Sequence, residues 1–317
     1  MTSLLAAHPL TLGTMYFGTT VPARIAHDVL DRARDLGALS WDTANIYAHW
    51  VGRDGGESER TLGAWFDSRG PIARDEVTLA TKIGNLPVAG GPGPGGTTGL
   101  GASAVRRQVT DSLQRLRTDR VEVLYAHIDD LHTPLDETLG ALSDLIDEGL
   151  VREIAASNYS AERLHAALSV PTAHRFTALQ QRFTYLRPAP GADLSPHVQL
   201  DDAVAHLAHR SGLTLVGYSP LLSGAYTRAD RPIPEQYRTP ALGPALLALG
   251  EVGSEVDLDA GQTVLAWMTQ RGRPVRPVAG VSSVGQIEDA WRAVTTELDP
   301  DQIDRLDRAR IVGPAAR

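Results

Sequence analysis

The sequence contains no cysteine. A chain without thiols has no disulfide, no thiolate nucleophile and no cysteine-ligated metal. It also has no long uncharged apolar run, so a transmembrane helix is not expected. The segment Met1–Leu12 lacks the basic stretch and the cleavage motif of a secretory signal. These absences favour a cytoplasmic protein.

Lysine is almost absent as well. Of the 30 basic residues, one, Lys82, is a lysine and the other 29 are arginines. A genome rich in G and C replaces lysine with arginine wherever plain positive charge suffices. A surviving lysine indicates a chemical need for an amine, because lysine and arginine are not interchangeable at active sites. Chance survival is the alternative.

Positive charge is not in excess. The chain has 317 residues, a net charge of −8 and a pI near 5.7, so no basic stripe is expected to neutralise nucleic-acid phosphates. Small molecules are the expected partners, and the composition leaves the oligomeric state open. An apolar fraction of 42% fits a globular chain with a buried core, either one large domain or two small ones.

Short apolar runs alternate with segments of helical period, which is typical of βαβ units around a parallel sheet. On one such segment Val105, Val109, Leu113 and Leu116 fall on a single helical stripe. Periodicity does not separate a closed barrel from an open doubly wound sheet. The pattern predicts eight strands: Leu12–Met15, Leu39–Asp42, Val77–Thr81, Val121–His127, Ile154–Ser157, Thr177–Gln180, Thr214–Tyr218 and Val275–Ala279.

Two segments look irregular: the Gly- and Pro-rich Asn85–Gly101, and the stretch from Leu221 to about Leu258, which contains four prolines after Leu221. Long loops inside a compact domain are commonly lids or binding loops. Each follows a predicted strand. In a barrel both would therefore be extended loops on the face formed by the C-terminal strand ends.

Four polar residues stand at or just beyond the ends of consecutive predicted strands. Asp42 ends the second strand with Tyr47 in the loop beyond it, Lys82 follows the third, and His127 ends the fourth. Catalytic groups converge at these ends in an α/β barrel. Taken singly, each residue has an ordinary structural explanation: an aspartate often caps a turn, a tyrosine often packs in a core, and a histidine is usually structural.

Several stretches occur in a characteristic order and spacing: LGTMYFG at Leu12–Gly18, WDTANIY at Trp41–Tyr47, GESERTLG at Gly56–Gly63, ATKIG at Ala80–Gly84, EVLYAHIDD at Glu122–Asp130, AASNYS at Ala155–Ser160, ALQQRFTYL at Ala178–Leu186, GYSPL at Gly217–Leu221 and AGVSSVGQIED at Ala279–Asp289. In these stretches the sequence resembles the aldo-keto reductase family over nearly its whole length. The resemblance implies one (β/α)8 barrel over residues 1–317 that binds an extended nicotinamide cofactor without a Rossmann domain.

By that resemblance Asp42, Tyr47, Lys82 and His127 look like the family's catalytic tetrad. A carbonyl that accepts hydride develops alkoxide charge, so the site needs an acid and a positive field. Tyr47 would be the acid, and an ammonium beside it is expected to lower the phenol pKa. Asp42 would keep Lys82 charged, and His127 would orient the carbonyl.

Further matches resemble the family's cofactor contacts. Ser157, Asn158 and Gln180 resemble ligands of the nicotinamide carboxamide, and Tyr218 resembles the aromatic residue that stacks on the nicotinamide. Ser219 and Leu221 resemble the pyrophosphate turn. The adenosine-phosphate end is matched by Ser282, Ser283, Gln286 and Asp289. A helix N-cap is the alternative explanation of the two serines.

The sequence departs from the family pattern in two places. Where the family often has glycine after the tyrosine, Ala48–Val51 lengthens the loop, so His49 and Trp50 are expected to line the substrate pocket, with rim packing as the alternative. No Lys or Arg occurs in Ala279–Asp289, the usual place for a cation that binds the 2′-phosphate. NADPH is the expected cofactor and NADH the alternative; Arg276 or an arginine of Leu221–Arg238 would have to supply the cation.

The expected function is therefore metal-free reduction of an aldehyde, ketone or keto-sugar by a nicotinamide cofactor. Two alternatives stay open. The same residues would serve an NAD(P)+-dependent sugar or alcohol dehydrogenase, because the chemistry is reversible. A cofactor-binding regulatory subunit of the same fold is the other, since fold alone does not fix function.

Overall fold

The computed structural model describes residues 3–51, 54–91, 93 and 95–311. Eight parallel strands close into a barrel in chain order, and β1 pairs with both β2 and β8. The eight predicted strands and the closed barrel are confirmed, with strand boundaries shifted by a few residues. The strands are β1 (Thr11–Gly13), β2 (Ser40–Asp42), β3 (Thr78–Ile83), β4 (Val121–Ala126), β5 (Val151–Ser157), β6 (Ala178–Arg182), β7 (Thr214–Tyr218) and β8 (Arg276–Gly280).

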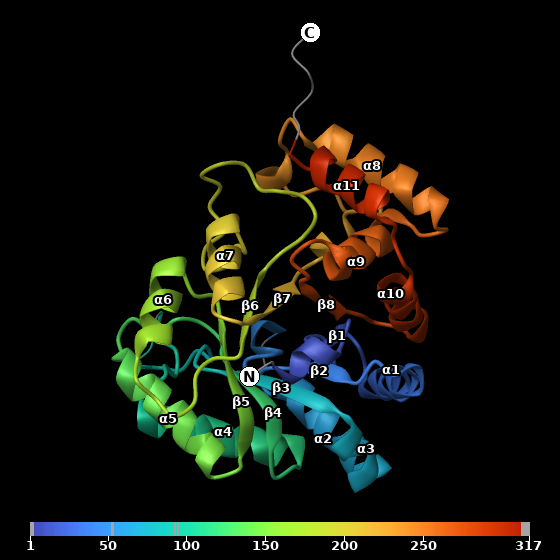
Figure 1. The fold of residues 1–317 in the computed structure, drawn as a ribbon. Coiled ribbons are helices and arrows are strands. Elements are labelled where there is room, and N and C mark those ends of the chain that lie inside the picture. Colours follow the sequence, from blue (N-terminus) through green and yellow to red (C-terminus); the bar gives the residue numbers. More distant parts are fainter. Residues whose placement is uncertain (1–2, 52–53, 92, 94, 312–317) are drawn as a thin grey trace.

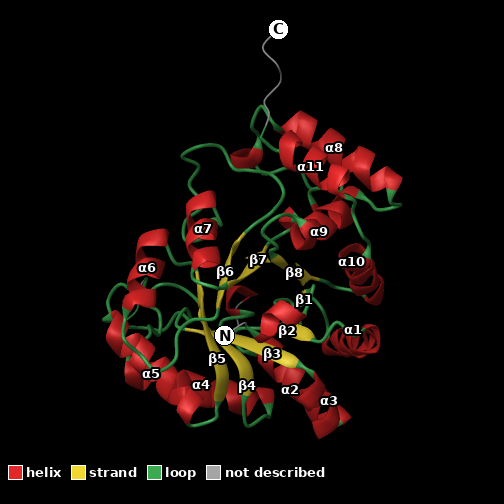
Figure 2. Ribbon diagram, viewed as in Figure 1, coloured by secondary structure: helices red, strands yellow, loops and turns green. Residues whose placement is uncertain are grey.

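Helices surround the barrel, as Figure 1 and the secondary-structure colouring of Figure 2 show. The longer helices are α1 (Ala23–Leu36), α2 (Glu57–Arg69), α3 (Pro71–Glu76), α4 (Ala102–Leu116), α5 (Leu135–Asp147), α6 (Ala161–Ser169), α7 (Asp202–Arg210), α8 (Leu242–Glu255), α9 (Ala260–Gln270), α10 (Val284–Thr295) and α11 (Pro300–Ala309). The described residues also form four short 3-10 helices: η1 (Leu4–Ala7), η2 (His49–Val51), η3 (Leu222–Gly224) and η4 (Glu235–Tyr237).

The helical stripes read from the sequence form the layer between helices and barrel. On α4 the four stripe residues Val105, Val109, Leu113 and Leu116 are all buried. Burying such a stripe supplies most of the free energy that holds a short helix in place. Among the described residues, no helix has the length and apolarity needed to span a membrane.

Side chains fill the barrel interior, and the N-terminal segment closes its amino end. Leu5 of η1 belongs to the same buried cluster as the interior residues Ala80, Val123 and Tyr125. Hydrogen bonds fix η1 there, because the buried Glu153 carboxylate accepts from the Leu4 backbone N–H at 3.0 Å. The opposite, carboxyl end of the barrel is therefore the open one.

The second irregular segment is more ordered than expected. The loop Asn85–Gly101 contains no helix among its described residues, but α8 occupies Leu242–Glu255 within the other segment. Pro244 was expected to interrupt helical structure, but it lies in the first turn of α8. A proline is tolerated there because a backbone N–H in the first turn has no intrahelical acceptor. The irregular stretch therefore ends at Ala241, and only its predicted extension to about Leu258 was wrong.

Helices α2 and α4 approach closely at Gly63, the last residue of the GESERTLG stretch. A Cβ added there would meet the Arg115 carbonyl oxygen at 2.2 Å and the Leu116 backbone carbon at 2.9 Å. Both are backbone atoms of α4 and cannot rotate away. Gly63 therefore sets the spacing of the two helices behind β2 and β3.

We predict opposite outcomes for two helical glycines. Gly63→Ala should lower the free energy of unfolding by about 1–3 kcal/mol, the usual cost of overpacking. Gly140→Ala on α5 is the control, because its Cβ would meet nothing within 4 Å. It should be neutral or raise stability by up to about 1 kcal/mol through better helix propensity. Urea unfolding of both variants is the measurement, and equal stability of the two would contradict the close approach.

Candidate active site

The polar residues predicted from strand ends meet at the open end of the barrel. Asp42 is the last residue of β2, Lys82 is the last but one of β3, and His127 directly follows β4. Tyr47 lies in the loop after β2 and precedes η2. Neighbouring strands place the first three side by side, because Asp42 pairs with Ala80 in β3 and Lys82 pairs with Tyr125 in β4.

Lys82 is the centre of this group and is only 1% exposed. Its Nζ donates to Asp42 Oδ2, to the Thr43 carbonyl oxygen at 3.0 Å and to the Tyr47 hydroxyl at 2.9 Å. An ammonium has three N–H donors, and all three are used. The geometry therefore fixes the amine and, through it, the phenol oxygen.

Asp42 is equally buried and has two further partners. Its Oδ1 accepts from Gln180 Nε2 at 3.0 Å, and its Oδ2 lies 3.4 Å from the Tyr47 hydroxyl. Gln180 was expected as a cofactor ligand, but the structure directs its amide nitrogen across the barrel to the carboxylate. This contact helps to balance a buried charge that would otherwise be costly.

A second buried carboxylate lies behind the lysine. Glu59 on α2 accepts from Thr81 in β3 and from Arg115 Nε on α4, each at 2.6 Å. Ser58 beside it bonds Thr14 at 2.7 Å, which ties α2 to the end of β1. These residues belong to the GESERTLG stretch, which resembles the family pattern, but the sequence pattern did not indicate that they anchor α2 behind β3.

The pKa of Tyr47 is raised rather than lowered. Burial raises the pKa of Tyr47 well above its ordinary value, and the negative charge of Asp42 raises it further. The expectation that Lys82 would lower the phenol pKa is therefore not met in this structure, because desolvation and the charge of Asp42 set the direction of the shift. The phenol is protonated at neutral pH.

His127 is uncharged at neutral pH. Burial lowers the pKa of His127 well below its ordinary value, and the positive charge of Lys82 lowers it further. Its ring centroid lies 6.2 Å from that of Tyr47, at 80°. Its Nδ1 is buried and has no hydrogen-bond partner among the described residues. A neutral imidazole beside the phenol offers one N–H donor to a substrate oxygen.

The loop after Tyr47 keeps a glycine-like conformation without glycine. Ala48 has φ 85°, in the left-handed region that disfavours side chains with a Cβ. The turn leads into η2, which carries His49 and Trp50. Trp50 is 48% exposed, and its ring lies edge-on to Tyr47 at 5.9 Å. The lengthened loop thus packs its tryptophan directly against the phenol.

Three of the predicted nicotinamide contacts lie together around the ends of β5 and β7. Ser157 ends β5, Asn158 follows it, and Tyr218 ends β7. Asn158 Nδ2 donates to Ser157 Oγ at 3.1 Å, and the Tyr218 hydroxyl donates to Asn158 Oδ1 at 2.7 Å. Ser157 Oγ accepts in this pair and no described residue accepts its proton, and the Tyr218 side chain is half-buried.

The predicted phosphate contacts follow β7 and β8. Ser219 has φ 55° and is exposed, and Leu221 precedes η3. In the loop before α10, Ser283 caps the helix by accepting from the Gln286 backbone N–H at 3.3 Å, as the N-cap alternative anticipated. The Ser282 backbone N–H donates to the Gln286 side chain at 2.7 Å. Asp289 on α10 accepts from Gln262 at 3.3 Å.

Arg276 is not a substitute for the missing 2′-phosphate cation. It is the first residue of β8, and its guanidinium donates to the Ala6 carbonyl oxygen at 3.0 Å. It therefore lies at the amino end of the barrel, opposite the predicted cofactor contacts. The arginines after β7 are ion-paired locally: Arg228 with Asp230 at 2.6 Å, and Arg238 with Glu235 at 3.2 Å.

Sequence reasoning missed three residues of this site. Thr43 contributes only its carbonyl oxygen, which no side-chain motif reveals. The buried Tyr125 ring lies 5.8 Å from Lys82 Nζ and continues the interior face of β4. His197, in the loop between β6 and α7, bonds Tyr218 at 3.0 Å and follows no strand end or recognisable motif.

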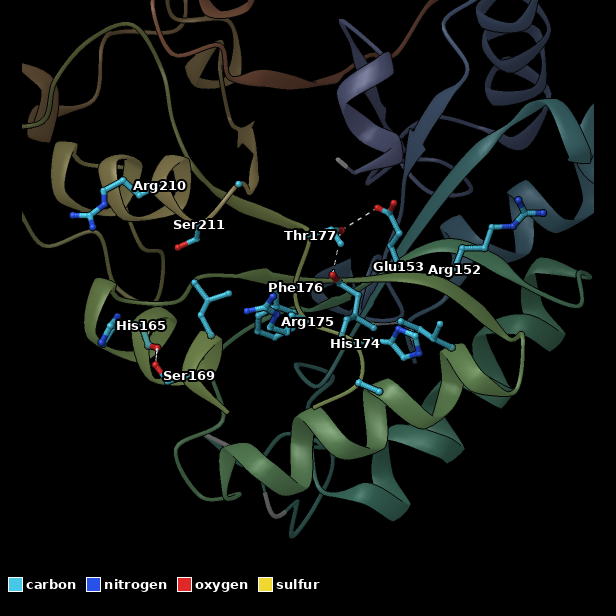
Figure 3. A pocket seen from close by; sticks show the side chains of 15 residues that line it. Arg152, Glu153, His165, Ser169, His174, Arg175, Phe176, Thr177, Arg210 and Ser211 are labelled. Carbon is cyan, nitrogen blue, oxygen red and sulfur yellow. Dashed lines mark hydrogen bonds between the residues drawn. The ribbon is translucent and has the colours of Figure 1, made fainter. Parts of the chain in front are cut away.

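A separate cavity of about 610 Å³ lies at the other end of the barrel (Figure 3). It is lined by the start of β5, by residues just before β6 and by residues of α5, α6 and α7, and Figure 3 shows the hydrogen bond from the Thr177 hydroxyl to Glu153. The arginines Arg152 and Arg210 project away from each other there. None of the predicted site residues lines this cavity.

The comparisons with known proteins identify the family and support the fold. The aldo/keto reductase family model matches residues 9–311, and this chain belongs to that family of oxidoreductases. The uncharacterized oxidoreductase YrpG of Bacillus subtilis is 30% identical, over 94% of this chain and 90% of its own length. Norsolorinic acid reductase stcV of Emericella nidulans is 29% identical, over 94% and 77%.

A solved structure supports the architecture. The thermostable aldo-keto reductase Tm1743, solved with the inhibitor epalrestat, superposes with a TM-score of 0.73 at 22% identity, over 95% of this chain and 94% of that one. At this identity the likeness shows the shared barrel fold. The family expected from the motifs is confirmed by the family model, independently of the fold comparison.

Proposed function

We propose that this enzyme transfers a hydride from a reduced nicotinamide cofactor to a carbonyl carbon, with Tyr47 as the general acid. One observation carries the proposal: the protonated Tyr47 hydroxyl lies 2.9 Å from the buried ammonium of Lys82, which Asp42 holds in place. An alkoxide oxygen formed beside this hydroxyl would find both a proton and a positive field. Aldehydes, ketones and keto-sugars are the proposed substrates.

The residues of this structure fit a nicotinamide dinucleotide. The Ser157 hydroxyl would bind the carboxamide beside Asn158 and Gln180, Tyr218 would stack on the ring, and the turn from Ser219 to Leu221 would bind the pyrophosphate. Ser282, Ser283, Gln286 and Asp289 would contact the adenosine end near the start of α10, where free backbone N–H groups favour an anion. The bound cofactor supplies the hydride.

The chain's own residues have separate tasks in this scheme. Tyr47 gives its proton to the substrate oxygen, and Lys82 keeps the phenol oriented while it loses that proton. The neutral His127 donates a hydrogen bond to the same oxygen and so orients the carbonyl. Trp50, whose ring contacts Tyr47, and His49 would form the wall of the substrate pocket and contact the substituents of the substrate.

Cofactor choice follows from charge around the adenosine end. We propose NADPH as the cofactor because the chain's motifs resemble the family throughout. NADH is the second candidate, on a specific observation: Ala279–Asp289 has no cation, and Arg276 lies at the other end of the barrel. Asp289 also adds negative charge to this segment, whereas Glu288 is paired with Arg32 at 2.7 Å.

The direction we propose is reduction. A relative that matches most of this chain is named norsolorinic acid reductase, which favours this direction over a sugar or alcohol dehydrogenase. The complete Asp42, Tyr47, Lys82 and His127 set favours an enzyme over a regulatory subunit. Initial rates with a carbonyl panel and with each cofactor in each direction compare these functions directly.

Tyr47→Phe tests the general acid. Removal of the hydroxyl should lower kcat by about 10²- to 10⁴-fold, the usual contribution of general acid catalysis, with little change in cofactor affinity. Tyr185→Phe is the matched control, because its hydroxyl donates to Leu306 far from the site. Half the wild-type rate in Tyr47→Phe would assign the acid elsewhere, and failure of the wild type to bind either NADPH or NADH would overturn the proposed function.

Trp50→Ala tests the substrate wall. The variant should change the order of kcat/KM across a panel of aldehydes and ketones while cofactor affinity stays near wild type, because Trp50 contacts Tyr47 rather than the predicted cofactor residues. Ile72→Ala, at an exposed position on α3, is the control. A uniform fall for every substrate would show that Trp50 only supports the loop.

A further inference from the structure

His197 contacts the site from a loop that the sequence analysis did not single out. It lies between β6 and α7, and its Nδ1 is 3.0 Å from the Tyr218 hydroxyl. The two ring centroids are 5.7 Å apart at 63°. The contact joins this loop to the aromatic residue that ends β7.

Backbone hydrogen bonds fix the loop at this point. The Arg182 N–H donates to the Val198 carbonyl oxygen at 3.1 Å, and the Leu200 N–H donates to the Arg182 carbonyl oxygen at 2.9 Å. These bonds extend the end of β6 with a short parallel bridge to Gln199. His197 is thus adjacent to a segment held by the barrel itself.

The orientation of the Asn158 amide is determined by its backbone partners. The Val198 N–H, which can only donate, lies 3.1 Å from Asn158 Oδ1. The His127 carbonyl oxygen, which can only accept, lies 3.1 Å from Asn158 Nδ2. An amide flipped by 180° would place like groups against each other at both contacts. Oδ1 is therefore the oxygen.

Because Asn158 Oδ1 is an oxygen, it determines which atom carries the proton in the Tyr218–Asn158 and His197–Tyr218 hydrogen bonds. The Tyr218 hydroxyl lies 2.7 Å from Asn158 Oδ1, an atom that can only accept. The single phenolic proton is used there, so the contact with His197 requires a proton on His197 Nδ1. Burial lowers the pKa of His197, and Arg182 lowers it further, so the ring is the neutral Nδ1–H form at neutral pH.

We propose that His197 is a positioning residue of the cofactor pocket, whose Nδ1–H holds the Tyr218 ring in the arrangement that receives the nicotinamide. The inference rests on the proposed function, in which Tyr218 stacks on the nicotinamide. A ring held before binding loses less freedom when the ligand arrives, which strengthens binding without any new contact.

Substitutions at His197 distinguish a donor at Nδ1 from simple loop packing. Asn carries its amide nitrogen on Cγ, where His carries Nδ1, whereas Gln carries it one atom further out. His197→Ala and His197→Gln should weaken NADPH or NADH binding by about 3- to 10-fold, the effect of one net hydrogen bond. His197→Asn should restore near wild-type affinity. His209→Ala, at an exposed position on α7, is the control.

Fluorescence titration of each variant measures the dissociation constant, and thermal unfolding measures stability. Rescue by Asn and failure of Gln at similar stability would support the proposal. Equal affinity in wild type, His197→Ala and His197→Asn would overturn it, as would a loss in both Asn and Ala that follows stability alone. Absence of cofactor binding by the wild type would overturn the proposed function and this inference with it.

A second readout needs no cofactor. The ¹⁵N chemical shifts of the His197 ring report which nitrogen carries the proton in the neutral form. We expect the proton on Nδ1 in the wild type and its loss from that position in Tyr218→Phe, where the acceptor oxygen is absent. A proton on Nε2 in the wild type would overturn the arrangement even if cofactor binding is normal.

Discussion

The site depends on one buried charge, the ammonium of Lys82. A cation and a carboxylate in a protein interior are costly unless every donor and acceptor is matched, because both lose their hydration. Asp42, the Thr43 carbonyl and the Tyr47 hydroxyl take up the three N–H groups of Lys82. The barrel makes this match possible, since adjacent parallel strands bring Asp42 and Lys82 to the same end.

Burial also sets the protonation states on which the proposed chemistry relies. Desolvation disfavours the charged form of any group, so it raises the pKa of Tyr47 and lowers the pKa of His127. It also lowers the pKa of Lys82, where the charge and hydrogen bond of Asp42 act in the opposite direction and favour the ammonium. The phenol keeps its proton and the imidazole stays neutral. Trp50, on the loop after β2, packs against Tyr47. Tyr218, Asn158 and His197 form a hydrogen-bonded network beyond the ends of β5 and β7.

Much of this could be predicted from the sequence, for physical reasons. Alternating strand and helix periods identify the eight strands. The strand ends then identify Asp42, Lys82 and His127. Both predictions need only the apolar pattern of short segments of the sequence. Contacts across the barrel leave no local signal, so the bond from Gln180 to Asp42 and the one from His197 to Tyr218 could not be anticipated. Arg276 was close in sequence to the cofactor stretch but begins its strand, which places it at the other end. The direction of the Tyr47 pKa depended on burial, which sequence does not show.

The most direct test of the central claim is the specificity constant of Lys82→Arg compared with that of Lys82→Met, with folding and cofactor binding checked in both. A guanidinium group is planar and wider than an ammonium, and it prefers to form two parallel hydrogen bonds to a carboxylate. It therefore cannot form the three hydrogen bonds that the compact ammonium of Lys82 makes to Asp42, Thr43 and Tyr47. Displacement of a preorganised group by about 1 Å costs on the order of 10²-fold. We expect kcat/KM of Lys82→Arg to fall by about that factor, close to the Lys82→Met value. A near-normal kcat/KM in Lys82→Arg would contradict the account, because any cation would then suffice and the lone lysine would have no chemical role.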